Sequence, residues 1–212
     1  MLLDINREYP TPKTKSKCPC CQTLVIAKCG TKKVHHWAHK SKIECDHWWD
    51  NETDWHRLWK ASVIKEYQEI IVGNHRADIK LPSGMVIELQ NSRLTDEETL
   101  EREVFYDKMI WVFNGDKFKD NFKFHLKEDG DPDWCAFYWH RHKSWIANCQ
   151  KPVWIDLGDK VLMVGKFNHK EEWKEFKGQP YQKKIVTGWG FLRDKIEAQV
   201  SIFGKYIDRK IV

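Results

Sequence analysis

Long apolar runs are missing from this chain of 212 residues. A membrane-spanning helix needs about 18 or more consecutive apolar residues, and the sequence contains no such stretch. The first residues, Met1 to Asp4, also lack the charged segment and following apolar segment of a secretory signal. Neither an internal repeat nor a low-complexity tract is present. We therefore expect a compact cytoplasmic protein with no membrane partner, large enough for one core plus a small module.

Charge of one sign does not dominate, since the net charge is only +5. Its distribution is uneven, however. Basic residues outnumber acidic ones in residues 1–47 and 117–212, whereas acidic residues prevail in residues 48–116. An acidic middle that binds metal between basic ends that neutralise phosphates suits a nuclease. A solvated surface of mixed charge also produces modest local biases, so this pattern supports a nucleic-acid partner without establishing one.

The cysteines are unevenly distributed along the chain. Four of the seven cysteines lie between Cys18 and Cys29. In a cytosolic protein such crowding indicates metal ligation rather than disulfides. Cys18 and Cys21 form a Cys-x2-Cys knuckle, which points two thiolates at one Zn²⁺.

The second pair of zinc ligands is less clear from spacing. His36 and His39 are closer together than the usual pair of zinc-binding histidines, whereas His39 and Cys45 are joined by a comfortable loop. We predict a zinc site made of Cys18, Cys21, His39 and Cys45, with His36 as the rival of His39. Cys29 and His47 are further candidates.

Two acidic residues stand on the two arms of a predicted hairpin. Strands are expected at 79–81 and 85–89, joined by a Pro-Ser-Gly turn. The two-residue period of a strand puts Glu88 and Gln90 on one face, which Asp78 can reach from the partner strand. Paired carboxylates together with substrate phosphate oxygens are what Mg²⁺ requires. The simpler alternative is that both carboxylates are solvent-facing strand charges.

A helix is predicted for residues 51–68, where apolar side chains recur at intervals of three and four and no Gly or Pro occurs. Glu52, His56 and Lys60 lie four residues apart and form a polar stripe along it. The simplest interpretation of the stripe is a solvated face, on which Glu52 and Lys60 are too far apart to interact.

A second helix is predicted for residues 96–107. Thr95 and Glu98 form a capping box at its start. Arg102 and Tyr106 are one turn apart and share a face. The apolar residues 109–114 that follow are typical of a buried strand.

Several ordered motifs together resemble a known family. Asp78, Glu88 and Gln90 have the form of a PD-(D/E)xK nuclease site in which Gln takes the place of the usual Lys. The wider series looks like the competence protein CoiA-like family over about residues 18 to 113. The motifs that carry this resemblance are Cys18-x2-Cys21, His36-Trp37-Ala38-His39, Glu52-x3-His56-x3-Lys60, Ile87-Glu88-Leu89-Gln90-x-Ser92, Arg102-x3-Tyr106 and Ile110-Trp111.

The resemblance implies an α/β fold, a PD-(D/E)xK-type mixed sheet with flanking helices, preceded by a small zinc-binding module. We expect the zinc module at 1–47, the nuclease core at 48–130 and a β-rich, basic and aromatic extension at 131–212. Within the extension, the aromatic and basic residues 134–145 suit either base stacking or an amphipathic core strand. Residues 152–167 are expected to form two strands.

The resemblance also implies catalytic roles. The first core helix of such nucleases contributes an acidic residue to the metal site, and Glu52 holds the matching position. Mg²⁺ or Mn²⁺ would be bound by Asp78, Glu88 and the carbonyl of Leu89. Gln90 offers only hydrogen bonds, whereas a Lys in its place can orient water and stabilise developing charge. The candidates for contact with the substrate are His56, Arg76, Arg102 and Tyr106.

We therefore expect a Mg²⁺- or Mn²⁺-dependent DNA endonuclease or exonuclease with a structural Zn²⁺, acting in DNA processing, uptake or recombination. One alternative is a zinc-stabilised DNA-binding protein with a weak or vestigial nuclease site. Another is an interaction factor carried by a mobile element. The sequence contains no signal for the oligomeric state.

Overall fold

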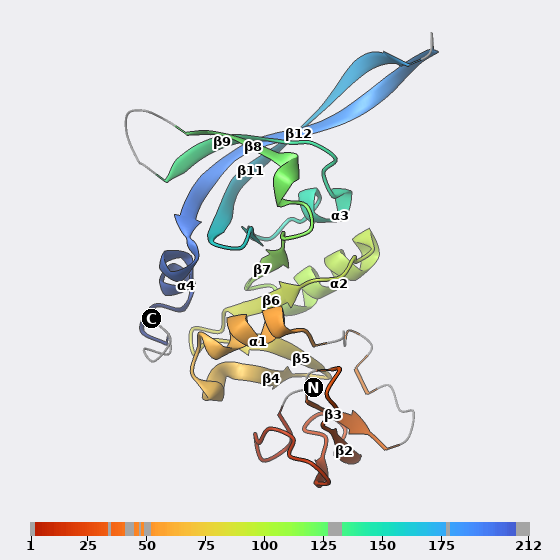
Figure 1. Cartoon of the computed structure of the whole chain (residues 1–212), viewed down its shortest axis with the longest axis vertical. Helices are drawn as coiled ribbons and strands as arrows, with labels where there is room; N and C mark the ends of the chain where they lie inside the picture. Colours follow the sequence, from red (N-terminus) through yellow and green to blue (C-terminus); the bar gives the residue numbers. More distant parts are fainter. Residues whose placement is uncertain are drawn as a thin grey trace. The chain divides into compact units, whose positions relative to one another are not determined.

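A computed structural model describes residues 3–33, 35–40, 45–46, 48, 52–126, 133–176 and 179–206 (Figure 1). The chain forms two compact units, residues 1–88 with 206–212 and residues 89–205. The limit between the units falls inside the segment 48–130 that the sequence predicts as the core, and the predicted segment boundaries stay predictions. Within the described residues, no helix is both long and apolar enough to cross a membrane.

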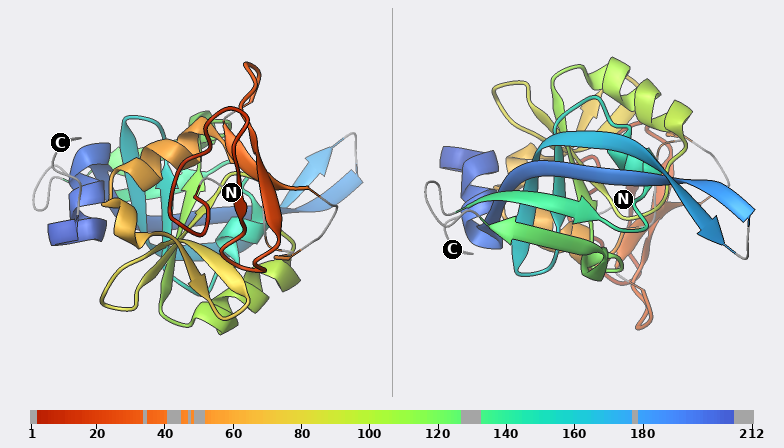
Figure 2. Two further views of the ribbon diagram at one scale, coloured as in Figure 1. Left: turned by 90° about the horizontal axis from the view of Figure 1, so that it is seen from below. Right: turned by 90° about the horizontal axis from the view of Figure 1, so that it is seen from above.

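The first unit begins with a small antiparallel sheet. Its strands are β1 (Lys15–Lys17), β2 (Leu24–Lys28) and β3 (His36–His39), in the order β1-β2-β3 (Figure 2, left, red to orange). Trp37 packs against Cys18 and Val25 in a small buried core, and its indole Nε1 donates to the carbonyl of Glu8 at 3.0 Å. This core is too small to be stable alone, because it contains few apolar side chains.

The rest of the first unit contains helix α1 (Asp54–Ala61), the strands β4 (Gln68–Val72) and β5 (His75–Lys80), and the first three residues of β6 (Val86–Gln90). The strands pair antiparallel in the order β4-β5-β6. The helix is shorter than the predicted 51–68, since a 3₁₀ turn at Lys65–Tyr67 leads directly into β4. Local apolar spacing cannot distinguish one long helix from a shorter helix followed by a turn and a strand.

The predicted hairpin between β5 and β6 is confirmed. Gly84 lies at the turn with a φ of 82°, a conformation that a side chain would strain. The Leu81 amide donates to the Met85 carbonyl at 2.9 Å. Along β5 the residues alternate, with His75, Ala77 and Ile79 buried and the residues between them partly exposed. Asp78 therefore lies on the more open face of β5.

The second unit contains a mixed sheet with flanking helices. Strand β7 pairs parallel with β10, whereas the pairs β10–β11, β11–β12, β12–β9 and β9–β8 are antiparallel, in the order β7-β10-β11-β12-β9-β8. Figure 2 (right) shows β11, β12, β9 and β8 side by side. The elements are α2 (Asp96–Tyr106), β7 (Met109–Asn114), a 3₁₀ turn (Lys119–Asn121), β8 (Phe122–Leu126), β9 (Trp134–Trp139), α3 (Ser144–Ala147), β10 (Val153–Asp156), β11 (Lys160–Phe176), β12 (Gln179–Asp194), α4 (Lys195–Phe203) and a last 3₁₀ turn (Gly204–Tyr206).

Strand β9 has one core face. Cys135, Phe137 and Trp139 are buried, and Trp139 stacks on Phe122 with ring centroids 4.7 Å apart. Of the two interpretations of this aromatic segment, the amphipathic core strand is therefore correct for 134–139. The α/β class with a mixed sheet is confirmed, and its assignment to the PD-(D/E)xK type stays a prediction.

Candidate functional site

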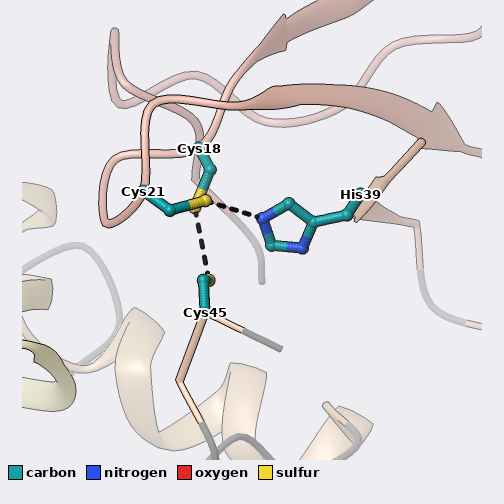
Figure 3. Close-up of side chains that lie close together, drawn as sticks. All are labelled: Cys18, Cys21, His39 and Cys45. Carbon is teal, nitrogen blue, oxygen red and sulfur yellow. Dashed lines mark hydrogen bonds between the residues drawn. The ribbon is translucent and has the colours of Figure 1, made fainter. Parts of the chain in front are cut away.

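Four side chains on and beside the N-terminal sheet point toward one another (Figure 3). They belong to Cys18, Cys21, His39 and Cys45, and their ligand atoms all lie within 4.8 Å of one another. The Cys21 Sγ is 3.2 Å from His39 Nε2, and the Cys18 Sγ is 3.8 Å from the Cys45 Sγ. Two thiolates that each bind a tetrahedral Zn²⁺ at about 2.3 Å are about 3.8 Å apart. These four residues, the Cys/His cluster, could hold a metal such as zinc.

Local geometry brings the first two cysteines together. Cys18 follows β1, and its carbonyl accepts from the Gln22 amide at 3.0 Å, which closes a tight turn before β2. Gln22 has a φ of 61°, in the left-handed region. This turn aims Cys18 and Cys21 at the same point, as the Cys-x2-Cys spacing predicts.

Strand β3 decides between the two histidines. His36 and His39 are three residues apart on one strand, so their side chains point to opposite faces. Only His39 belongs to the Cys/His cluster, while Cys29 lies elsewhere, with its Sγ 3.6 Å from the Pro10 carbonyl. His47, the other candidate, lies outside the described residues.

The thiols of the Cys/His cluster have unequal acidity. Burial raises the pKa of Cys21, but the hydrogen bonds with Thr23 and His39 have a larger, opposite effect. The net result is a pKa lowered to about 6. Burial and the neighbouring Cys18 raise the pKa of Cys45. A bound cation would favour the thiolate of each, because metal ligation deprotonates cysteine.

A second group of charges surrounds Lys60 of α1. The Lys60 side chain is almost fully buried, and its Nζ lies 3.1 Å from Glu52 Oε2, 3.2 Å from Glu69 Oε1 and 2.7 Å from Asp78 Oδ1. We call these four residues the Lys60 cluster. The interpretation of Glu52 and Lys60 as too far apart to interact is wrong, because Glu52 lies outside the helix, before the N-cap Thr53, and its carboxylate reaches the Lys60 ammonium.

Strand pairing explains why a cation is needed there. Gln68 pairs with Ile79 and Ile70 with Ala77, so Glu69, whose φ of 50° interrupts the regular pairing, lies close to Asp78 on the neighbouring strand. Like charges opposite each other in a sheet repel. The Lys60 ammonium between the two carboxylates turns this repulsion into attraction.

Further groups extend the Lys60 cluster. Glu88 of β6 accepts from the Asp78 backbone amide at 3.3 Å. Arg76, two residues before Asp78, has a raised pKa: burial lowers it, but the carboxylates of Glu69, Asp78 and others outweigh that effect. The Glu52 Oε1 atom is buried and accepts no hydrogen bond from any described residue. A buried carboxylate oxygen without a donor is uncommon in folded proteins.

The metal-binding geometry is confined to one place among the described residues. Among those residues, only the Cys/His cluster brings together three or more His, Cys, Asp or Glu side chains whose ligand atoms lie close enough for one ion. Glu52 and Asp78 instead meet at the Lys60 ammonium. A Mg²⁺ or Mn²⁺ at Asp78 and Glu88 therefore stays a prediction.

Glu69 is the residue of this cluster that sequence analysis missed. Its carboxylate is buried, and its Oε2 accepts from the Leu3 amide at 2.9 Å. Burial raises the pKa of Glu69, but the charges of Lys60 and Arg76 lower it more, so the pKa lies below its usual range. An acidic residue directly before the apolar run Ile-Ile-Val was the available signal.

We expect Glu69→Gln to destabilise the protein by about 1–3 kcal/mol at neutral pH, because a buried charged partner of Lys60 is lost. A depressed carboxyl pKa contributes stability above the unfolded-state value of about 4.5, and this contribution is lost as the pH falls through the folded-state value. Urea unfolding of the wild type and of Glu69→Gln should therefore show a difference in the free energy of unfolding that shrinks below about pH 4.5. A difference that is constant over this range would contradict the assignment.

Other predicted site residues have structural partners. The His56 Nδ1 lies 2.7 Å from the Thr53 hydroxyl and accepts from the Thr53 amide, in a capping box of α1. In the second unit, Arg102 donates from Nη1 to Gln90 Oε1 at 3.1 Å, and Gln90 donates to the Ser92 hydroxyl at 2.9 Å. Arg102 and Tyr106 are both buried on α2, whose predicted Thr95 capping box is confirmed. Their proposed contacts with a substrate stay predictions.

The N-terminal part of the chain has a recognisable relative. Residues 6–47 match the N-terminal domain of competence protein CoiA. This match includes all four residues of the Cys/His cluster, and it supports the resemblance to the CoiA-like family over this segment. No curated protein and no solved structure matches the chain. Beyond residue 47 the resemblance rests on the motifs of the sequence.

Proposed function

We propose that this protein is a metal-dependent nuclease that hydrolyses phosphodiester bonds of DNA. The observation that carries the proposal is the meeting of Glu52 and Asp78 at the Lys60 ammonium, with Glu88 joined to Asp78 across the hairpin. Carboxylates from neighbouring strands and a nearby cation are the groups that metal-assisted phosphodiester hydrolysis uses.

Each residue of this site would have a distinct role. Asp78 and Glu88, with the Leu89 carbonyl that follows on β6, would hold Mg²⁺ or Mn²⁺, which when bound polarises the phosphate and lowers the pKa of an attacking water. The Asp78 side chain is 21% exposed, against 7% for Glu52, so Asp78 is the more accessible ligand. Lys60 orients Asp78 and supplies the positive charge that Gln90 lacks.

We also propose that the Cys/His cluster binds one Zn²⁺. Three thiols and one imidazole make a closed set of four ligands, which is typical of structural rather than catalytic zinc. The ion would hold together a small sheet whose core is otherwise only Trp37, Val25 and their neighbours.

A zinc-stabilised DNA-binding protein with a weak nuclease site is the second candidate. The Lys60 ammonium already contacts Glu52, Glu69 and Asp78 at 2.7–3.2 Å and offsets part of their negative charge. A divalent cation would have to compete with this ammonium for Asp78. The observation thus favours weak metal binding in the absence of a substrate phosphate.

A cleavage assay tests the nuclease proposal. Labelled single-stranded, duplex and branched DNA are incubated with the pure protein and Mg²⁺, Mn²⁺ or no added metal. We expect metal-dependent cleavage, and we expect Asp78→Asn and Glu88→Gln to reduce its rate by at least about 100-fold, because each removes a charge that holds the cation.

Asp54→Asn is the matched control, since Asp54 is an exposed carboxylate on α1 with only a surface ion pair to Arg57. Its cleavage rate should equal that of the wild type. If the wild-type protein cleaves none of these substrates but still binds them, the nuclease proposal fails and the DNA-binding candidate replaces it.

A further inference from the structure

A cavity of about 420 Å³ lies entirely within the second unit. Its walls come from the segment after β6, the end of β7 and the turn between β9 and α3. This volume falls in the range of about 300–1,000 Å³ that is typical of small-ligand sites. Neither the Cys/His cluster nor the Lys60 cluster contributes a residue to it.

The charge of the cavity is positive. Arg93 and Lys117 are exposed at its walls, and Lys143 is half-buried there. No acidic residue is among the described residues that line it. The neighbouring Asp116 is already paired with Lys119 at 2.8 Å. Three cations without a lining carboxylate favour an anionic ligand such as a phosphate.

Aromatic and amide groups complete the walls. Trp145 is half-buried and packs edge-on against Phe113, with ring centroids 5.3 Å apart, which holds the indole in a defined orientation. The Lys143 ammonium lies 5.9 Å from the centre of the buried Phe118 ring. Asn114 donates to Asn91 at 2.8 Å, and this amide pair can also bond the edge of a base.

We propose that this cavity binds one nucleotide of a single-stranded nucleic acid, with its phosphate on Arg93, Lys117 and Lys143 and its base against Trp145. The class of ligand rests on the proposed function, but binding here requires no cleavage. A single strand is the fitting source because its bases are free to turn out and stack on an aromatic side chain. In a duplex the bases are paired and stacked on each other, so entry of a base would first carry the free-energy cost of unpairing and unstacking.

Fluorescence anisotropy with a labelled oligothymidylate, without added divalent cation, tests the proposal. We expect Arg93→Ala/Lys117→Ala to weaken binding about tenfold or more and to lower the slope of log affinity against log salt by about 0.7 for each lost phosphate contact. Trp145→Leu should also weaken binding by about tenfold while leaving that slope unchanged, because stacking releases no counterions. A thermal melt verifies that each variant is folded.

Lys123→Ala/Lys166→Ala is the matched control, since both lysines are exposed in the same unit and neither lines the cavity. Its affinity and salt slope should stay close to those of the wild type. Equal loss in the control and in the Arg93/Lys117 variant would overturn the proposal, as would wild-type affinity in the folded Trp145→Leu variant. Thymidine monophosphate and inorganic phosphate serve as competitors. If thymidine monophosphate displaced the labelled oligonucleotide as effectively as unlabelled oligonucleotide does, the ligand would be a free nucleotide rather than a single strand.

Discussion

We expect Cys18→Ser and Cys21→Ser to lose a bound Zn²⁺ and to unfold the N-terminal sheet. The four ligand atoms of the Cys/His cluster lie within 4.8 Å of one another, whereas the surrounding core is small. Structural zinc in small modules contributes about 10–16 kcal/mol of apparent folding free energy near neutral pH. Elemental analysis of the purified protein should find about one zinc per wild-type chain and much less in each variant.

Cys29→Ser is the control for this experiment. Cys29 comes from the same module and is also partly buried, but its Sγ faces the Pro10 carbonyl instead of the cluster. We expect this variant to retain full zinc and near wild-type stability. Wild-type protein that contains no zinc after purification without chelator would refute the assignment, as would undiminished zinc in Cys18→Ser.

The second large effect concerns Lys60→Met. This substitution keeps the length and apolar stem of the side chain but removes the ammonium that contacts Glu52, Glu69 and Asp78. Removing one partner of a buried ion pair costs about 3–5 kcal/mol, because it leaves uncompensated buried charge. We expect a loss of stability of this size in urea unfolding at neutral pH.

The pH dependence of Lys60→Met provides a sharper test. In the wild type, burial lowers the pKa of Lys60, but Asp78, Glu52 and Glu69 raise it more, so its stabilising effect persists up to the unfolded-state value of about 10.5 and is lost only as the pH rises through the folded-state value. In the variant, the buried carboxylates have raised pKa values, so acidification below neutral pH should recover part of the stability.

Arg57→Met serves as the control on the same helix. Arg57 is exposed and makes only a surface pair with Asp54, so its loss should cost no more than about 0.5 kcal/mol. If Lys60→Met were as stable as Arg57→Met, the Lys60 cluster would not be a buried charge network. Added Mg²⁺ should stabilise Lys60→Met more than the wild type, because the cation then meets no competing ammonium.

Local features of this protein were predictable from the sequence because they depend on residues close together in the chain. The Pro-Ser-Gly turn placed the β5–β6 hairpin, and the Thr95 capping box placed the start of α2. Cys18 and Cys21 converge through a single tight turn, so their spacing was sufficient. Helix α1 was predicted too long, because the apolar residues Val63, Ile64 and Tyr67 lie in the turn and 3₁₀ turn that lead to β4 rather than on the same helix face.

Contacts between distant segments of the chain decided the features that local patterns could not predict. The sequence by itself determined the α/β class, the hairpin with Asp78 and Glu88, and a metal-binding set that included Cys18, Cys21 and Cys45. The predicted choice of His39 over its rival His36 is confirmed, and only the tertiary structure placed Lys60 between Glu52, Glu69 and Asp78. It also assembled the basic cavity from segments about 50 residues apart. Burial of a charge is stable only where opposite charges from other elements surround it, and no local pattern of residues contains that information.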